Sequence, residues 1–412
     1  MNWEFSSSGR QEGTALRVNS YQPETDLLIY IIAGEPSGDN LGARIMAALR
    51  KATQGKVKFT GIGGPRMTEA GLESLFPMEE LSIMGITEIL PHIPKLLGRI
   101  SATVNDVTIK KPNAVLTIDT PAFSFRVAKK LTGRGIPLIH MVAPSVWAWK
   151  PWRAKKVAGF LDHLLTLLPF EPPYFEKEGL ASTFVGHPVL ESGADRGDGT
   201  SFRKHHGLDE KQPILCLLPG SRKSETKRLL PVFADVCKTI NSSTNNLAIV
   251  VPTVPSLKEQ ISQEIRQWDL PVIVLDDVRE KFDAFAASDA ALAASGTVSL
   301  ELAMAKTPAV IAYKVNPLTA WIAKKLVKLD YVSLVNILLK REVVPEFLLE
   351  RCKAELIAPK LRELLENDKA KQKQLAGYEN ALSYLTPENG ETPSEKAASA
   401  ILDVLQQRKR EG

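Results

Sequence analysis

The sequence has few cysteines and no long hydrophobic run. Its three cysteines, Cys216, Cys237 and Cys352, have neither CxxC nor metal-ligand spacing, so we expect reduced thiols in a cytosolic protein. The longest uncharged apolar segment, residues 135–149, contains two prolines and is too short for a membrane-spanning helix. Residues 1–25 lack the apolar run of a signal peptide and are expected to form a disordered extension. Any membrane contact is therefore expected to be peripheral.

Sequence signatures of metals and cofactors are also absent. There is no Walker A motif and no Asp-x-Asp pair, and the six histidines lack zinc-type spacing. The turn GIGGPRM resembles a dinucleotide fingerprint, but Arg66 occupies the position of the third glycine, which counts against a nicotinamide cofactor. A net charge of +5 over 412 residues suits anionic ligands or a membrane surface but is too diffuse to indicate nucleic acid. We predict no metal, no cofactor and no nucleic-acid partner.

From residue 26 the chain repeats short apolar strands, turns and helices, a pattern typical of α/β proteins. A stretch rich in Gly, Asp and basic residues interrupts the pattern and predicts a linker, after which a second α/β series begins. Near the end, Thr392-Pro-Ser-Glu395 predicts a capping box and an amphipathic helix. We predict an α/β fold of two facing domains with a cleft between them, divided into an extension (1–25), a first domain (26–190), a linker (191–212), a second domain (213–385) and a C-terminal helix (386–412).

The first candidate site is the glycine-containing turn in IIAGEPSGDNLGARI. A buried strand leads into this turn, and Asp39 or Asn40 is expected to cap a helix that begins near residue 40. Turns at the carboxyl ends of strands are where open α/β sheets bind ligands. Glycines also make tight turns for steric reasons alone, so a purely structural role stays open. The candidate loop residues are Gly34, Ser37 and Gly38.

The second candidate site is QPILCLLPGSRKSETKRLLP, residues 212–231, which predicts a strand, a Pro-Gly turn and a helix that opens on Arg222 and Lys223. A helix N-terminus already carries unpaired N–H groups and a partial positive charge, so cations there are unfavourable unless an anion lies among them. A phosphate would resolve the conflict, whereas the alternative is that both side chains point into water. The candidate phosphate contacts are Gly220, Ser221 and Arg222.

A third strand and turn, in DAALAASGTVSLELAM, place Ser295, Gly296 and Thr297 before a helix with Glu301 in its first turn. These residue types are ordinary at helix starts, which leaves a structural role open. They also suit a nucleoside diphosphate, with N–H and hydroxyl donors for phosphate and a carboxylate for two ribose hydroxyls. Without a metal, a leaving diphosphate would be neutralised by protein dipoles and cations, which gives Arg222 a function.

Two segments have compositions suited to lipid. LSIMGITEILPHIPKLLGRI carries apolar residues at helical spacing, although its two prolines prevent one regular helix. VAPSVWAWKPWRAKKV gathers Trp147, Trp149 and Trp152 beside four cations, which favours a membrane interface or a polyanion. Packing in the protein's own core is the alternative for both segments, and we expect at least one tryptophan to pack there. The candidate membrane or acyl contacts are Ile86, Ile89, Leu90, Ile93 and Leu97.

Taken together, these motifs resemble the lipid-A-disaccharide synthase family. The resemblance runs in order through about residues 27–358, over AGEPSGD, GIGGPRM, MGITEILPHIPKLL, IDTPAFSFRVAKK, VAPSVWAW, PFEPPYFEKEG, FVGHPV, LLPGSRKSE, ASGTVSLE and YVSLVNIL. The sequence departs from the family at DTPAFS, where the more usual Asp-Ala-Pro-Asp-Phe-Asn keeps its first acid, Asp119, but loses the second acid and the Asn.

The resemblance implies an inverting glycosyltransferase with two Rossmann-like domains (GT-B type). It would join UDP-2,3-diacylglucosamine to 2,3-diacylglucosamine 1-phosphate through a β-1,6 bond and release UDP at the cytoplasmic face of the inner membrane. It also implies a catalytic role for Asp119, a diphosphate contact at Arg222, phosphates at the turn 295–297, and nucleotide contacts at Glu301 and Asn336. A homodimer that exchanges C-terminal parts is implied as well.

The residues leave some alternatives open. Asp119 follows an apolar strand and is our first candidate for the general base, with Glu35 of the glycine-containing turn as its rival. Other functions consistent with the patterns are a UDP-sugar enzyme of the same fold, such as an epimerase, an oxidoreductase that uses the GIGG turn, and a non-catalytic peripheral membrane protein.

Overall fold

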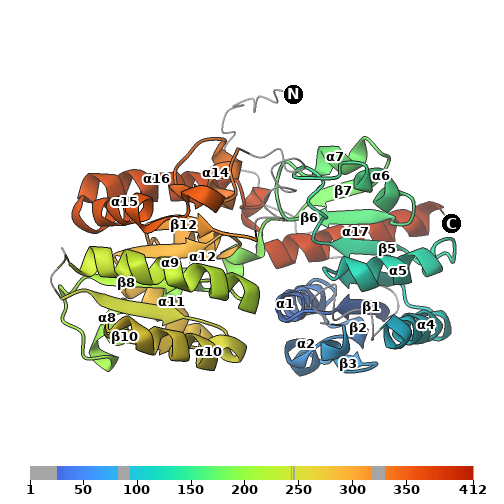
Figure 1. Cartoon of the computed structure of the whole chain (residues 1–412). Coiled ribbons are helices and arrows are strands. Elements are labelled where there is room, and N and C mark those ends of the chain that lie inside the picture. The colour runs from blue at the N-terminus through green and yellow to red at the C-terminus, as the bar shows by residue number, and fades with distance from the viewer. Residues whose placement is uncertain (1–25, 82–92, 243, 245, 317–329, 412) are drawn as a thin grey trace.

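Two parallel β-sheets form the frame of the molecule. The computed structural model describes residues 26–81, 93–242, 244, 246–316 and 330–411, and it places helices against both sheets (Figure 1). Most strands are short, nearly continuous apolar runs, as expected for strands that helices cover on both faces. We refer to the first sheet with its helices as the first unit and to the second as the second unit.

The first sheet has seven parallel strands in the order β3-β2-β1-β4-β5-β6-β7. Its strands are β1 (Leu27–Ala33), β2 (Val57–Ile62), β3 (Glu73–Ser74), β4 (Ala114–Ile118), β5 (Leu138–Met141), β6 (His163–Thr166) and β7 (Ala181–Phe184). The second sheet has six parallel strands in the order β10-β9-β8-β11-β12-β13. These are β8 (Ile214–Leu218), β9 (Ala248–Pro252), β10 (Val272–Leu275), β11 (Ala290–Ala294), β12 (Ala309–Tyr313) and β13 (Glu346–Leu348).

Helices follow most strands and cover the sheets. Those before β8 are α1 (Pro36–Ala52), α2 (Pro65–Glu69), α4 (Ile93–Lys110), α5 (Pro121–Leu131), α6 (Arg153–Ala158), α7 (Pro172–Glu176) and α8 (Gly199–His205). Those after it are α9 (Lys223–Asn241), α10 (Pro255–Ile265), α11 (Val278–Ala287), α12 (Val298–Met304), α14 (Leu334–Leu339), α15 (Ala354–Glu366), α16 (Asp368–Ser383) and α17 (Pro393–Glu411). Helix α8 lies within the predicted linker and packs on α11 of the second unit.

Each sheet has a point at which the strand order reverses. In the first sheet the reversal lies between β1 and β4, and in the second between β8 and β11. In open parallel sheets the helices leave such neighbouring strands toward opposite faces, and a crevice opens at the carboxyl ends of the two strands. The topology therefore specifies one expected binding crevice in each unit.

The last helix returns to the first unit. Thr392 and Glu395 form the predicted capping box, in which each side chain accepts from the other's backbone N–H at 3.2 Å. Ala397, Ile401 and Leu405 of α17 are buried in the same core as Ile29 of β1, and Figure 1 shows α17 beside the strands of the first sheet. The predicted domain limits themselves stay a prediction.

Candidate active site

Four of the predicted motifs lie at the carboxyl ends of the strands that flank the two reversal points. Residues 34–38 follow β1, with residues 36–38 already at the start of α1, and Asp119 follows β4. In the second unit, the turn 220–222 follows β8 and the turn 295–297 follows β11. Arg222 lies close enough to Glu35 for its charge to lower the pKa of that carboxyl group, so the crevice of the second unit lies beside that of the first. The topology thus places together residues that lie far apart in the sequence.

Asp119 lies in a strained turn. Its φ is 51° and that of Thr120 is 46°, which is the left-handed region that residues with a Cβ atom seldom occupy. The backbone N–H of Asp119 donates to Met141 O at 3.1 Å, and the hydroxyl of Ser124 donates to the carbonyl of Asp119 at 2.9 Å. Strain of this kind persists only where surrounding contacts impose it, and it concentrates at functional sites. These contacts hold the carboxylate at the sheet edge.

The turn after β1 packs closely on the turn that carries Asp119. A Cβ atom on Gly34 would lie 2.6 Å from Oγ1 of Thr120, so only glycine allows this approach. At the start of α1, Gly38 is buried and Ser37 is exposed. The structure thereby brings Glu35 and Asp119 to one crevice.

Both carboxyl groups have raised pKa values. Burial raises the pKa of Asp119, and the N–H of Thr120 acts in the opposite direction. Burial also raises the pKa of Glu35; the negative charge of Asp119 raises it further, whereas Arg222 lowers it. A carboxylate with a raised pKa is a stronger proton acceptor, so both groups stay candidates for the general base.

The expectation for Asp39 was wrong. Helix α1 begins at Pro36 with Glu35 at its N-cap, so Asp39 lies in the first turn and does not cap its own helix. Its buried carboxylate instead accepts hydrogen bonds of 2.8, 2.9 and 3.0 Å from the backbone N–H groups of Gly64, Arg66 and Met67. Asp39 therefore caps α2, and GIGGPRM is a turn built around that carboxylate.

Arg222 is the N-cap residue of α9. Gly220 makes the turn before it with a φ of 105°, where a side chain would be strained. The guanidinium of Arg222 is 63% exposed and lies 3.3 Å from the carboxylate of Glu225 in the first helical turn. Glu225 thus places a negative charge beside the cations at the start of α9 and offsets part of their repulsion by the helix N-terminus. Because exposed pairs are weak, the guanidinium stays available to a bound anion.

A pocket of about 280 Å³ lies between the turns after β8 and β11. Arg222 is the last residue of the turn after β8. In the turn after β11, the hydroxyl of Ser295 donates to Val332 O at 3.3 Å. Six of the predicted nucleotide contacts line this pocket, namely Gly220, Ser221, Ser295, Gly296, Thr297 and Glu301. The sequence prediction therefore identified two of the turns that line one pocket, whereas Glu225, Asp276 and Asp277 also line it and were not predicted. Contact of the predicted residues with a nucleotide stays a prediction.

Lys281 is a pocket residue that sequence reasoning missed. Its Nζ lies 3.0 Å from each carboxylate oxygen of Glu301, and both side chains are 23% exposed. An ion pair that is largely shielded from water fixes the orientation of the Glu301 side chain. Lys281 comes from α11 and Glu301 from α12, so no local sequence pattern links them.

For the UDP-sugar substrate that the family resemblance implies, we expect Lys281→Ala to raise KM by about tenfold with a smaller change in kcat, because Glu301 loses the cation that orients it. Lys281→Arg should restore most of the affinity. Lys360→Ala, which removes a similar pair with Glu363 on α15 (2.9 Å), is the matched control and should leave KM unchanged. Steady-state kinetics check this prediction, and an unaltered KM in Lys281→Ala would remove the residue from the site.

Asn336, a predicted nucleotide contact, lies beneath the pocket and does not line it, and its contact with a nucleotide stays a prediction. Its side chain is fully buried, its amide donates to Val344 O and Glu346 Oε1, and its carbonyl accepts from the N–H groups of Val343 and Val344, all at 2.8 to 2.9 Å. These bonds use its full hydrogen-bonding capacity. Glu346 also accepts from Val332, whose carbonyl binds Ser295, so Asn336 supports the pocket turn from beneath.

The candidate lipid contacts are partly visible. Ile86, Ile89 and Leu90 lie outside the described residues; Ile93 is the first residue of α4, and Leu97 is 52% exposed. Their contact with lipid stays a prediction. Among the described residues, no helix is both long and apolar enough to cross a bilayer.

The tryptophan-rich segment divides between core and surface. Trp147 is half-buried, packs against Phe170 and donates to Glu171 at 3.2 Å. This confirms that at least one tryptophan packs in the core. Trp149 and Trp152 are exposed.

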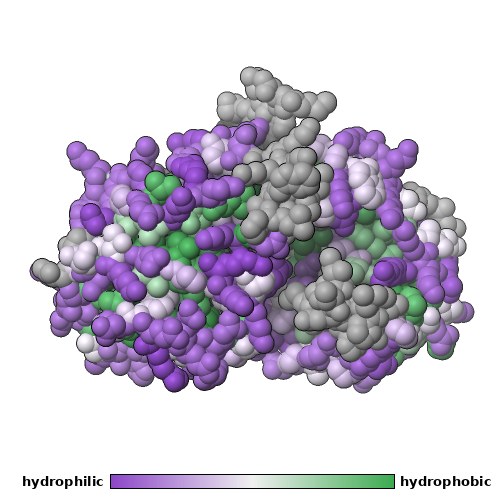
Figure 2. All heavy atoms as spheres, viewed as in Figure 1, coloured by the Kyte–Doolittle hydropathy of each residue, from purple (hydrophilic) through white to green (hydrophobic). Residues whose placement is uncertain are grey.

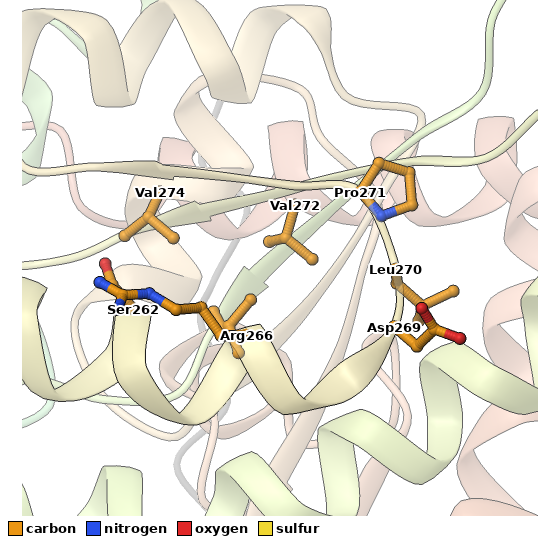
Figure 3. Close-up of a pocket in the computed structure, with 8 residues that line it drawn as sticks. Ser262, Arg266, Asp269, Leu270, Pro271, Val272 and Val274 are labelled. Atoms are coloured by element: carbon orange, nitrogen blue, oxygen red, sulfur yellow. The ribbon is translucent and has the colours of Figure 1, made fainter.

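A second and larger hollow, of about 580 Å³, lies away from the four motif turns. Figure 3 shows Arg266, Asp269 and Leu270 beside Val272 and Val274 of β10, the edge strand of the second sheet. No predicted motif contributes to this hollow, and it lies at neither reversal point. We therefore place the candidate active site at the smaller pocket and the facing crevice of the first unit.

One potential metal-binding group occurs among the described residues. It consists of His205 and His206 at the end of α8 and Glu280 in α11, whose ligand atoms lie within 4.8 Å of one another. None of the three lines the pocket between β8 and β11. The prediction of no metal in the reaction stays a prediction.

Two parallel sheets with facing crevices define the GT-B class of two-domain α/β glycosyltransferase folds. The solved S. aureus MnaA–UDP co-structure has this fold, with a TM-score of 0.62 and 11% identity over 93% of this chain and 96% of that chain. The likeness confirms the predicted α/β fold class.

The chain belongs to the lipid-A-disaccharide synthetase family, whose family model matches residues 29–401. The lipid-A-disaccharide synthase of Rhodospirillum centenum is 51% identical over 384 residues, which cover 93% of this chain and 96% of the relative. That of Paramagnetospirillum magneticum is 50% identical over 389 residues, covering 93% and 99%. The predicted enzyme class, a glycosyltransferase of lipid A biosynthesis, is confirmed, and the other functions considered are not favoured.

Proposed function

We propose that the chain transfers the diacylglucosamine of UDP-2,3-diacylglucosamine to the 6-hydroxyl of 2,3-diacylglucosamine 1-phosphate, with inversion at the anomeric carbon. The products are the β-1,6-linked lipid A disaccharide 1-phosphate and UDP. The observation that carries this proposal is the convergence of four motif turns at two facing crevices. The names of the relatives support it, and the S. aureus neighbour of the same fold was solved with UDP.

The second unit is proposed to hold the UDP moiety. Glu301, oriented by Lys281, accepts hydrogen bonds from the ribose hydroxyls, and the phosphates bind between the turns 220–222 and 295–297. As the bond between the sugar and the diphosphate breaks, negative charge grows on the leaving oxygen. Arg222 and the N–H groups at the start of α9 neutralise that charge.

The first unit is proposed to hold the acceptor. The acceptor 6-hydroxyl attacks the anomeric carbon from the face opposite UDP, through an oxocarbenium-like state. Asp119 takes the hydroxyl proton as the new C–O bond forms, and the electron pair of the breaking C–O bond leaves with UDP. Glu35 lies in the same crevice and is the alternative base.

The acyl chains of both substrates give the membrane a role. We propose that the enzyme is peripheral at the cytoplasmic face of the inner membrane and that the segment carrying Ile86, Ile89, Leu90, Ile93 and Leu97 contacts lipid. A homodimer with exchanged C-terminal parts also belongs to the proposal. In the single chain described here, α17 packs on α1 of the same chain.

The linkage of the product tests this proposal. Incubation with both lipid substrates should give a disaccharide whose anomeric proton coupling in NMR spectra reports a β bond, because inversion converts an α-linked UDP-sugar into a β-glycoside. A through-bond correlation from that proton to C6 of the acceptor should show the 6-position. An α-linked product would contradict attack from the opposite face, and no disaccharide at all would contradict the proposed reaction.

A further inference from the structure

A long part of the first unit carries charge of only one sign. Residues 120–161 contain no aspartate or glutamate. Within the described residues, no ion pair of 4.0 Å or less neutralises any cation of this stretch. Its eight cations are Arg126, Lys129, Lys130, Arg134, Lys150, Arg153, Lys155 and Lys156. Unpaired cations at this density attract an anionic partner.

These cations come from neighbouring elements on the same side of the first sheet. Phe125 of α5 lies 5.4 Å, ring to ring, from Phe160, which follows α6, and Lys129 of α5 lies over the same Phe160 ring at 5.3 Å. Helix α4 packs against α5, and buried side chains of α4, α5 and α6 share one core with those of β4 and β5. The exposed cations of α5 and α6 therefore belong to one surface.

Two exposed tryptophans lie at the end of this surface nearest the crevice. Trp149 is 38% exposed and Trp152 is 60% exposed. Lys150 lies 4.2 Å from the ring centroid of Trp149, and Lys156 lies 6.0 Å from that of Trp152. Large apolar rings beside cations are typical of side chains at the boundary between water and lipid.

The position of the tryptophans links them to the active site. They lie in the loop between β5 and α6, and β5 is the direct neighbour of β4, at whose end Asp119 lies. The loop starts at Val142, a β-branched residue with a φ of 77°, whose N–H donates to Leu165 O at 3.2 Å. The hydrogen bond to β6 holds this strained residue at the carboxyl edge of the sheet.

We propose that residues 149–156, together with the exposed cations of α5, form a docking surface for a bilayer that contains anionic lipids. The lysines and arginines bind lipid phosphates, and the two tryptophan rings enter the boundary between headgroups and acyl chains. The inference rests on the proposed function, because a membrane against this surface places the crevice of Asp119 beside the pool of diacylated substrates. A single-stranded nucleic acid would use the same cations and rings, so it is an outcome of the test.

The test is co-sedimentation of the full chain with vesicles of phosphatidylcholine, alone or mixed with phosphatidylglycerol. We expect binding to the mixed vesicles that weakens as salt rises. Lys155→Glu/Lys156→Glu should lower the bound-to-free ratio by about tenfold or more, since each cation near an anionic bilayer contributes separately to binding. Trp149→Ala/Trp152→Ala should lower the same ratio without changing its salt dependence.

The matched control is Lys369→Glu/Lys373→Glu, an equal change of charge on exposed lysines of α16 in the second unit, which should bind mixed vesicles within about twofold of the wild type. UDP affinity, measured by calorimetry, should be the same in all variants and shows that each is folded. The proposal would be overturned if both loop variants bound vesicles as well as the wild type does. It would also be overturned if these residues bound oligo(dT) more tightly than mixed vesicles. A wild-type chain that binds vesicles but not UDP would contradict the proposed function and leave the docking surface standing.

Discussion

Replacement of Asp119 by Asn is expected to lower kcat by about 10² or more, with little change in the KM for the UDP-sugar. The amide keeps the shape of the side chain but accepts no proton from the acceptor hydroxyl, and the UDP-sugar is proposed to bind to the other unit. Asp119 lies at the carboxyl end of β4 in a turn that is strained at two consecutive residues. Steady-state turnover with saturating acceptor measures the loss.

Glu35→Gln is the matched comparison, because Glu35 is the other half-buried carboxyl group of the same crevice. If Asp119 is the base, Glu35→Gln should lose clearly less turnover than Asp119→Asn. Burial raises the pKa of Asp119, so wild-type activity should fall as the pH drops through that raised value and the carboxylate becomes protonated. Retention of more than about a tenth of wild-type turnover by Asp119→Asn would assign the base to another group.

Replacement of Arg222 by Ala is expected to weaken inhibition by UDP and to lower kcat, each by about tenfold to 10²-fold. The guanidinium lies at the N-terminus of α9, is 63% exposed and pairs with Glu225 among the described residues, so the change should leave folding intact. The loss in kcat follows because the charge on the leaving diphosphate exceeds that in the bound substrate. Product-inhibition kinetics with UDP measure both effects.

Lys223→Ala is the control for Arg222, since Lys223 is the neighbouring exposed cation at the start of the same helix. It should change UDP inhibition far less, because the next residue of a helix points to a different side. Equal effects from the two substitutions would mean that general positive charge, and not a specific phosphate contact, accounts for binding. Unchanged UDP inhibition in a folded Arg222→Ala protein would remove this residue from the proposed site.

The parts of the site that sequence predicted are those with local causes. A buried apolar strand, a glycine-containing turn and a helix start follow one another within about a dozen residues, and parallel strand order then brings such turns to one edge. For this reason residues 220–221 and 295–297, which sequence singled out separately, lie at one pocket. The start of α17 also has a local cause, because the two residues of its capping box lie within four positions of the sequence.

The parts that sequence did not predict depend on contacts between distant segments. Asp39 caps α2 from 25 residues away, and Lys281 holds Glu301 across 20 residues and two helices. The side chain of Asn336 binds a buried loop and Glu346, and no periodic pattern in the sequence indicates these contacts. The start of α1 had a local signal, Pro36 at its first turn, which outweighs the nearby Asp39 and Asn40 as a marker of the helix start.

The most direct test of the account is UDP release by the purified chain from UDP-2,3-diacylglucosamine, with and without 2,3-diacylglucosamine 1-phosphate, in excess EDTA. We predict rapid release of UDP only when the acceptor is present, with one disaccharide formed for each UDP. We also predict full activity in EDTA, because cationic side chains of the protein neutralise the leaving diphosphate. Release that does not depend on the acceptor, an epimerised UDP-sugar without release, or activity that requires added magnesium would contradict it.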